Sequence, residues 1–220
     1  MLNLNDIAPI AVGGHRTVYP HPERKDLCVK VLHEPWQQIN RRLNDPFRHF
    51  RSRRHFDENR SEAHELERLQ RRLGGLMAVH FPKLHGLVDT DLGEGLVVER
   101  VSDQDGKTSI TLKNYLWLHG LDGACTAALD EFWAFLFEHR VAVRDPMPHN
   151  LAMQRLPDNR LRVVMIDGFG SSDFLPFRYW IPSLAVRKLQ SRRNRTERRI
   201  KRELDAKQQG KTPSQEGMAQ

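Results

Sequence analysis

Cysteine is scarce in this chain of 220 residues, and no zinc-type spacing or long apolar run is present. The two cysteines, Cys28 and Cys125, lie in apolar surroundings, which suits buried reduced thiols better than a disulfide framework. No run of about eighteen apolar residues exists, so the sequence offers no candidate transmembrane helix. Residues 1–6 also lack the basic and apolar regions of a signal peptide. We therefore expect a soluble, cytoplasmic protein.

Positive charge is concentrated near the end of the chain. The formal net charge is +7, and residues 187–202 alone contain nine Arg or Lys and one Glu. Residues 1–186 are neutral as a whole, so the high isoelectric point belongs to this one segment. We predict a basic helix that contacts an acidic partner, nucleic acid or an anionic membrane surface. A solvated, partly disordered tail is the alternative.

Two stretches in the second half of the chain present oxygen-bearing side chains. An apolar run, 141–143, precedes Asp145 and Asn150, and a predicted strand over 161–166 ends just before Asp167. Carboxylate and amide oxygens suit Mg²⁺, which proteins usually hold with one or two side chains together with substrate phosphates. The arrangement therefore predicts a site for a magnesium-bound phosphate compound, although an aspartate-glycine pair after a strand also occurs in plain hairpin turns.

A glycine turn lies near the start of the chain. Gly13 and Gly14 separate a predicted strand over 4–12 from a second strand that contains Val18. Glycine permits unusual backbone angles and close approach, so the N–H groups of such a turn can cover a phosphate. A plain hairpin is the alternative.

A buried lysine and an amphipathic helix follow. Lys30 lies within the apolar strand 27–32, where its charge needs an anionic partner. A snorkelling lysine on an edge strand is the alternative. A helical pattern that includes Glu62 and Glu65 then runs to a glycine pair at Gly74.

Taken in order, these motifs resemble the glycine-rich loop, strand lysine, catalytic loop and metal-binding aspartate of the protein kinase superfamily. The chain most resembles the YrbL family, small kinase-like bacterial proteins associated with the PhoP regulatory network. The resemblance implies an α+β, two-lobed, protein-kinase-like fold with a truncated C-terminal lobe and a basic helical tail. It places a nucleotide-binding lobe at 1–100, a reduced, mostly helical lobe at 101–186 and the tail at 187–220.

The resemblance also implies a role for each motif. Asp145 is expected to be the catalytic base, with Asn150 and Asp167 as the metal ligands. Lys30 is expected to neutralise nucleotide phosphates and to pair with a helix glutamate. Glu65 fits the family's spacing for that glutamate, and Glu62 is the second choice. The residues expected to surround the nucleotide are Gly13, Gly14, Val18, Lys30, Glu99 and Val101.

Two departures from the kinase pattern bear on activity. Met147 occupies a position where the resembling kinases carry a cation, and His149 is a possible substitute. Arg16 and Ala11 replace two patterned glycines of the loop. Beyond Gly170 the chain is too short for the helices that bind peptide substrates, so an ordinary protein kinase is not expected.

Three functions remain open at this point. The first is a phosphotransferase that uses ATP and Mg²⁺ on an unknown acceptor, such as a protein, a sugar or a lipid precursor, in bacterial signalling or envelope stress. The second is a nucleotide-binding pseudokinase, which the loss of a cation at Met147 favours. The third is an adaptor that acts through its basic segment.

Overall fold

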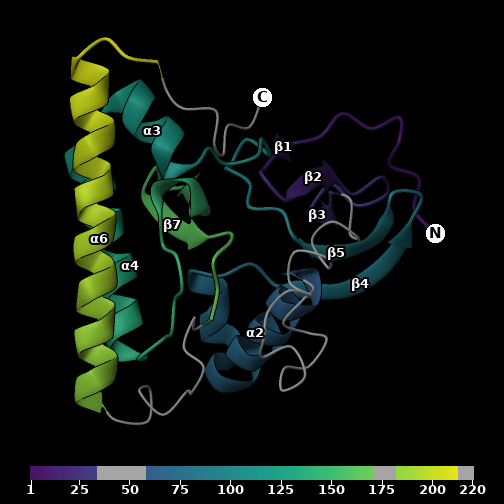
Figure 1. The fold of residues 1–220 in the computed structure, drawn as a ribbon, viewed down its shortest axis with the longest axis horizontal. Coiled ribbons are helices and arrows are strands. Elements are labelled where there is room, and N and C mark those ends of the chain that lie inside the picture. Colours follow the sequence, from purple (N-terminus) through teal and green to yellow (C-terminus); the bar gives the residue numbers. More distant parts are fainter. Residues whose placement is uncertain (34–57, 171–181, 213–220) are drawn as a thin grey trace, which may run out of the picture. The chain divides into compact units, whose positions relative to one another are not determined.

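The computed structural model describes residues 1–33, 58–170 and 182–212, which fall into two compact units (Figure 1). The first unit comprises the described residues up to Ala78 together with 82–100, and it is built around a β-sheet. The second comprises 79–81 and the described residues from Val101 onward, and it is mostly helical. The predicted α+β fold class is confirmed.

The first unit contains a five-stranded antiparallel sheet with the strand order β1-β2-β3-β5-β4. Strand β3 lies at the centre, and because both of its faces are covered, its first five residues are all buried. In the register of the sheet, Lys30 of β3 lies between Val18 of β2 and Leu96 of β5. The strands are β1 (Ala11–Val12), β2 (Arg16–Pro20), β3 (Leu27–Leu32), β4 (Leu84–Thr90) and β5 (Gly93–Glu99).

Helix α2 (Glu58–Leu73) packs on this sheet, against β3, β4 and β5. Its buried positions recur at helical spacing and form one stripe, Asn59, Glu62, Ala63, Leu66 and Leu69. The helix ends where Gly74 takes a positive φ of 55°, as the glycine pair predicts, and a short 3-10 helix, η3 (Gly74–Val79), follows.

The predicted strand over residues 4–12 is wrong for most of its length, because only β1 is extended and paired. Leu4 is fully buried in a loop, and its backbone N–H donates to the Asp91 carboxylate at 2.8 Å. Apolar side chains therefore enter the core here without sheet pairing, which an apolar pattern alone cannot distinguish from a strand.

Among its described residues, the second unit places a β-hairpin beside three α-helices. Thr111 and Asp122 cap α3 and α4, since their side chains accept hydrogen bonds from the backbone N–H groups of Asn114 and Cys125. The elements are α3 (Leu112–His119), α4 (Gly123–Glu138), the 3-10 helix η4 (Pro148–Asn150), β6 (Leu151–Arg155), β7 (Leu161–Met165) and α6 (Pro182–Gln208).

Helix α6 contains the predicted basic segment and packs along the second unit (Figure 1). Its buried side chains are separated by four, seven, four and three residues, which places them on one face: Ala185, Leu189, Thr196, Ile200 and Glu203. The Thr196 hydroxyl donates to the Pro146 carbonyl at 2.8 Å, and the Trp117 indole donates to the Glu203 carboxylate at 3.0 Å. The helix was predicted, but its packing was not.

This packing predicts a large difference between two leucines of α6. Leu189 is 1% exposed and Leu184 is 38% exposed. Leu189→Ala should lower the free energy of unfolding by about 2 kcal/mol or more, because it leaves a cavity, whereas Leu184→Ala should change it by less than about 0.5 kcal/mol. Urea unfolding of both variants measures the difference. Equal, small effects would mean that α6 is a detached tail.

Two further expectations concern membranes and thiols. Among the helices that the structure describes, none has both the length and the apolar character that a membrane span requires. Cys28 and Cys125 are free and buried, and burial raises their thiol pKa values to about 11 and about 12. Both thiols are therefore protonated and unreactive at neutral pH.

Candidate functional site

A group of buried charges lies between the sheet and α2 in the first unit, and we call it the Lys30 cluster (Arg16, Lys30, Asn59 and Glu62). The Lys30 ammonium lies 2.7 Å from one Glu62 carboxylate oxygen, and the Arg16 guanidinium lies 2.6 Å from the other. The Asn59 amide donates to the backbone carbonyl of Lys30 at 2.9 Å, which ties α2 to β3. All four residues are less than 9% exposed.

One carboxylate in this cluster serves two cations. Buried charges are tolerated where they are paired and hydrogen-bonded, so Glu62 stabilises both Arg16 and Lys30. Arg16 and Lys30 thus bring two cationic side chains to one buried place in the first unit. Arg16 replaces a glycine of the kinase pattern, and its charge adds to the cluster that contains the predicted phosphate-neutralising lysine.

The prediction that Glu65 pairs with Lys30 is wrong, and Glu62, the second choice, is the partner. The Glu65 side chain is 23% exposed and its carboxylate lies 3.5 Å from Arg68 one turn along the same helix. Both glutamates precede a leucine by four residues, so spacing alone could not separate them. The rotation of α2 about its axis is set by packing, and it turns Glu62 rather than Glu65 toward β3.

The predicted glycine turn joins β1 to β2. The Gly13 N–H donates to the Arg16 carbonyl at 2.8 Å, and a Cβ on Gly13 would lie 3.3 Å from that oxygen, a tight approach that favours glycine. In the part of the chain that the structure describes, no neighbouring atom lies within 4 Å of a Cβ built on Gly14. Val18 is paired with Ala11 on one side and with Lys30 on the other. The turn and the Lys30 cluster therefore share one short stretch of sheet.

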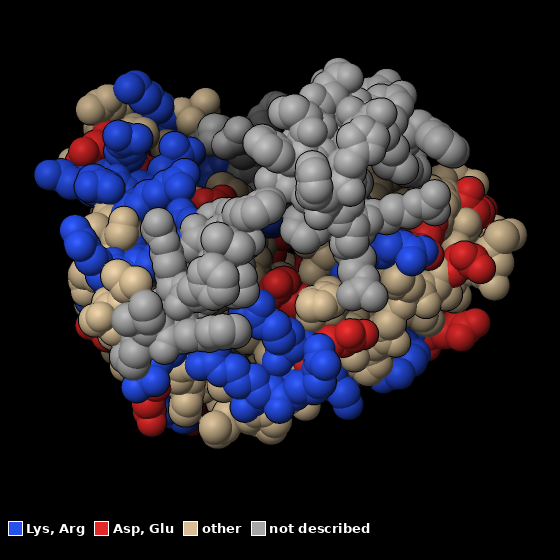
Figure 2. Space-filling view, turned by 60° about the horizontal axis from the view of Figure 1, so that its bottom comes forward, with Lys and Arg blue, Asp and Glu red and all other residues tan. Residues whose placement is uncertain are grey.

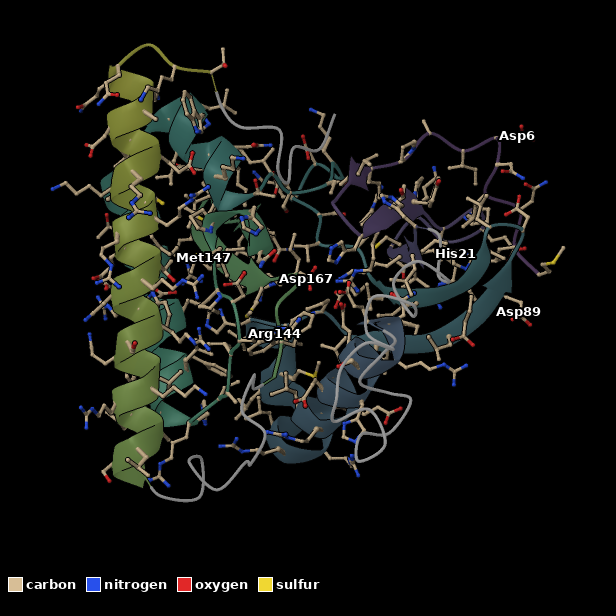
Figure 3. All side chains as sticks on the ribbon, viewed as in Figure 1. Asp6, His21, Asp89, Arg144, Met147 and Asp167 are labelled. Carbon is tan, nitrogen blue, oxygen red and sulfur yellow. The ribbon has the colours of Figure 1, made fainter. Side chains whose placement is uncertain are left out.

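The second group of predicted residues lies at one end of the β6–β7 hairpin, in the second unit. In this antiparallel pair Leu151 lies opposite Met165, so Asn150, just before β6, and Asp167, just after β7, are at the same end. The Ile166 N–H donates to the Asn150 carbonyl at 2.9 Å and continues the pairing to that end. Figure 3 labels Asp167 just beyond the end of β7.

Asp145 is held at this same end by two sets of hydrogen bonds. The Asn150 amide nitrogen donates to the Asp145 carbonyl at 2.9 Å and lies 3.4 Å from its carboxylate. The backbone N–H groups of Arg144 and Asp145 both donate to the Gly168 carbonyl, at 2.9 and 3.1 Å. Asp145, Asn150 and Asp167 therefore lie at one end of the hairpin, and we call these three residues the Asp145 site.

Gly168 makes the close approach within the Asp145 site possible. Its φ is +80°, and a Cβ at this position would lie 2.8 Å from the Asp145 carbonyl oxygen. Only glycine combines this backbone angle with that contact at little cost. The glycine after Asp167 therefore has a structural role that the sequence motif alone does not state.

The Asp145 site has the oxygen ligands that Mg²⁺ prefers. One Asp167 carboxylate oxygen accepts from the Gly168 N–H at 2.6 Å, and a carboxylate is the type of oxygen ligand that Mg²⁺ prefers. In its bonds to Asp145, Asn150 uses its amide nitrogen, which leaves the amide oxygen as a ligand atom. No group of three His, Cys, Asp or Glu that could hold a metal occurs in the described part of the chain. The two oxygens fit Mg²⁺ that is also held by phosphates, and they do not fit an all-protein metal site.

Two of the residues expected to surround the nucleotide, Glu99 and Val101, lie where the chain passes from the first unit to the second. Glu99 ends β5, and its backbone N–H donates to the Lys83 carbonyl at 2.9 Å. Val101 opens the second unit, and its carbonyl accepts from the Ser109 N–H at 2.9 Å. These two backbone groups are therefore already engaged within the protein.

Sequence reasoning missed one part of the Asp145 site. Met147 is 7% exposed and, with Asp145 and His149, lines a pocket whose other residues are four arginines of α6. Figure 3 labels Met147 beside α6, and Figure 2 shows Lys and Arg side chains gathered on the side of the molecule where α6 lies. The four arginines were interpreted as part of a separate tail. The pocket residues from α6 are Arg195, Arg198, Arg199 and Arg202.

Comparison with known proteins identifies relatives of this chain. A family model described as PhoP regulatory network protein YrbL matches residues 2–204. The YrbL proteins of Escherichia coli (strain K12) and Shigella flexneri are each 26% identical over 191 residues, which cover 86% of this chain and 82% of each relative. A solved structure, Rad53 1-466 in complex with AMP-PNP, is 16% identical with a TM-score of 0.43 over 84% of this chain and 42% of that one. The chain thus spans less than half of the Rad53 structure and most of the YrbL proteins.

Proposed function

The chain belongs to the YrbL family of PhoP regulatory network proteins, and from this premise we propose that it is an ATP- and Mg²⁺-dependent phosphotransferase in bacterial signalling. The observation that supports the proposal best is the Asp145 site, where one hairpin end presents Asp145, Asn150 and Asp167 together. A carboxylate base beside two oxygen ligands is the arrangement that phosphoryl transfer requires.

Each group has a distinct task in this proposal. Asp145 orients the acceptor hydroxyl and accepts its proton. Asn150 and Asp167 would hold Mg²⁺, and the bound ion would supply neutralisation of phosphate charge. In the first unit, as the family resemblance implies, Lys30 would neutralise nucleotide phosphates and the turn at Gly13 and Gly14 would cover them. Glu99 and Val101 belong to the segment that meets the adenine.

A pseudokinase is the second candidate, and the uncharged Met147 favours it. Met147 is buried beside Asp145, where the resembling kinases carry a cation. The four arginines of α6 that line the same pocket weaken this candidate, because they return positive charge to the place where the sequence indicates a loss. ATP turnover separates the two functions, since a pseudokinase binds ATP without consuming it.

The proposal predicts that ATP stabilises the protein only when Mg²⁺ is present. At a free ATP concentration 100 times the dissociation constant, the free energy of unfolding should rise by about 2.7 kcal/mol. Chemical unfolding with ATP, with Mg²⁺ and with both measures this gain. If no nucleotide stabilises the protein at millimolar concentration, the phosphotransferase and the pseudokinase are both rejected, and an adaptor function becomes the better account.

A further inference from the structure

An arginine-lined pocket lies beside Asp145, wholly within the second unit. Its volume is about 430 Å³, which lies in the range of roughly 300–1,000 Å³ typical of small-molecule sites. Asp145 and Met147 line it from the loop that precedes β6, and Arg195, Arg198, Arg199 and Arg202 line it from α6. The predicted catalytic base therefore shares a pocket with four guanidinium groups.

The arginines face this pocket because of their spacing and because α6 is fixed against the loop. Residues 195, 198, 199 and 202 follow the three- and four-residue intervals of one helix face. Thr196, within the same turn, is fully buried and donates its hydroxyl hydrogen to the Pro146 carbonyl, next to Asp145. This bond holds the arginine face beside the loop that carries the base.

The pocket has more positive than negative charge. Arg199 is paired with Glu203 at 3.1 Å, and the Arg195 guanidinium lies 4.0 Å from the Asp145 carboxylate. Within the described ranges no ion pair joins Arg198 or Arg202 to a carboxylate. Guanidinium groups match phosphate with two parallel hydrogen bonds, so these two arginines suit a phosphate group on a ligand.

We propose that the acceptor is a small hydroxyl compound that also carries a phosphate group, with that phosphate bound by Arg198 and Arg202. The proposal rests on the phosphotransferase function and names its substrate class. The acceptor hydroxyl oxygen forms a bond to the γ-phosphorus of ATP, and the bond from that phosphorus to the β–γ bridging oxygen breaks. ADP leaves with the electron pair, and Asp145 accepts the hydroxyl proton.

Binding of inorganic phosphate to the full-length protein tests the pocket without ATP. Arg198→Gln/Arg202→Gln should weaken phosphate binding roughly tenfold or more, because each lost guanidinium removes charge-assisted hydrogen bonds. The matched control, Arg187→Gln/Lys201→Gln, removes the same charge from α6 outside this pocket, and it should bind phosphate like the native protein. Equal weakening in both variants, or no saturable binding in the millimolar range, would overturn the proposal.

A second measurement needs no variant and so avoids any effect on folding. Phosphate should protect Arg198 and Arg202 from modification by phenylglyoxal, while Arg187 should react at the same rate with and without phosphate. Equal protection at all three positions would overturn the proposal that Arg198 and Arg202 bind the phosphate. If the native protein shows no Mg²⁺-dependent binding of ATP, the proposed function is rejected, but this phosphate result is unchanged. Failure of the proposed function and failure of the phosphate site are therefore distinguishable.

The phosphate can belong to a soluble compound or to a lipid headgroup. Glycerol 3-phosphate and vesicles that contain phosphatidic acid present the same chemical group from these two sources. If glycerol 3-phosphate competes with inorganic phosphate for the native protein, and this competition is abolished in Arg198→Gln/Arg202→Gln, the acceptor is a soluble compound. If the vesicles alone compete, the acceptor is a lipid. If neither competes with inorganic phosphate, at concentrations where inorganic phosphate itself binds, the proposed acceptor class is contradicted.

Discussion

Glu62→Ala should lower the free energy of unfolding of the first unit by about 3–5 kcal/mol. The substitution removes the carboxylate that Arg16 and Lys30 share, and the loss of a buried charge partner is far more costly than the loss of a surface contact. Glu65→Ala is the matched control on the same helix. Its side chain is 23% exposed and, among the described residues, its one ion pair is with Arg68, so the change should stay within about 0.5 kcal/mol.

Urea unfolding measures the free energy of unfolding of the two variants. Hydrogen exchange of the β3 amides then shows whether the loss of stability lies in the first unit, which contains both substitutions. Glu62→Gln refines the result, because it keeps the shape of the side chain and removes only the charge. It should also destabilise β3. If Glu62→Ala and Glu65→Ala unfold at the same urea concentration, the Lys30 cluster does not stabilise the first unit, and the pairing of Lys30 with Glu62 is wrong.

The sequence predicted most elements of the first unit because they depend on local patterns. The apolar strand around Lys30 and the helix that ends at Gly74 are both present. The partner of Lys30 could not be chosen from spacing, since Glu62 and Glu65 lie about one turn apart on the helix. A signal was available, because Asn59, Ala63 and Leu66 share one face with Glu62.

The packing of α6 was missed for a different physical reason. The stripe that it buries contains Thr196 and Glu203 between apolar residues, so a search for apolar periodicity finds too few members. Both polar residues are satisfied by hydrogen bonds to distant partners, Pro146 and Trp117, and such partners are not evident from a single sequence. The buried positions of α6 are four, seven, four and three residues apart. A search for this helical spacing that accepted polar as well as apolar residues would have found the buried face.

Arg16 shows how a departure from a motif can be misread. By comparison with the kinase glycine loop it is a missing glycine, which favours an inactive protein. In the structure its guanidinium lies 2.6 Å from Glu62 and belongs to the Lys30 cluster. Because long-range ion pairs depend on the tertiary fold, this role could not be deduced from the local sequence.

Asp167→Ala and Asp145→Ala should have opposite consequences for nucleotide binding and for transfer. In the proposed function Asp167 supplies the carboxylate ligand of Mg²⁺, so its loss should remove the Mg²⁺-dependent part of the ATP affinity. Asp145 is proposed to act on the acceptor, so its loss should leave that affinity largely intact and should lower turnover by roughly 10²- to 10⁴-fold. The contrast is informative because both residues lie in one site, where Gly168 ties Asp145 to the segment after Asp167.

Calorimetric titration of ATP into the native protein and these two variants, each with and without Mg²⁺, tests the central claim most directly. The native protein and Asp145→Ala should bind ATP more tightly when Mg²⁺ is present, and Asp167→Ala should bind it equally with and without the metal. Measurement of ADP release in the same samples, with a small-molecule extract as the source of acceptor, should detect turnover in the native protein alone. Equal loss of ATP affinity in both variants, or native binding that is indifferent to Mg²⁺, would contradict the roles assigned to Asp145 and Asp167.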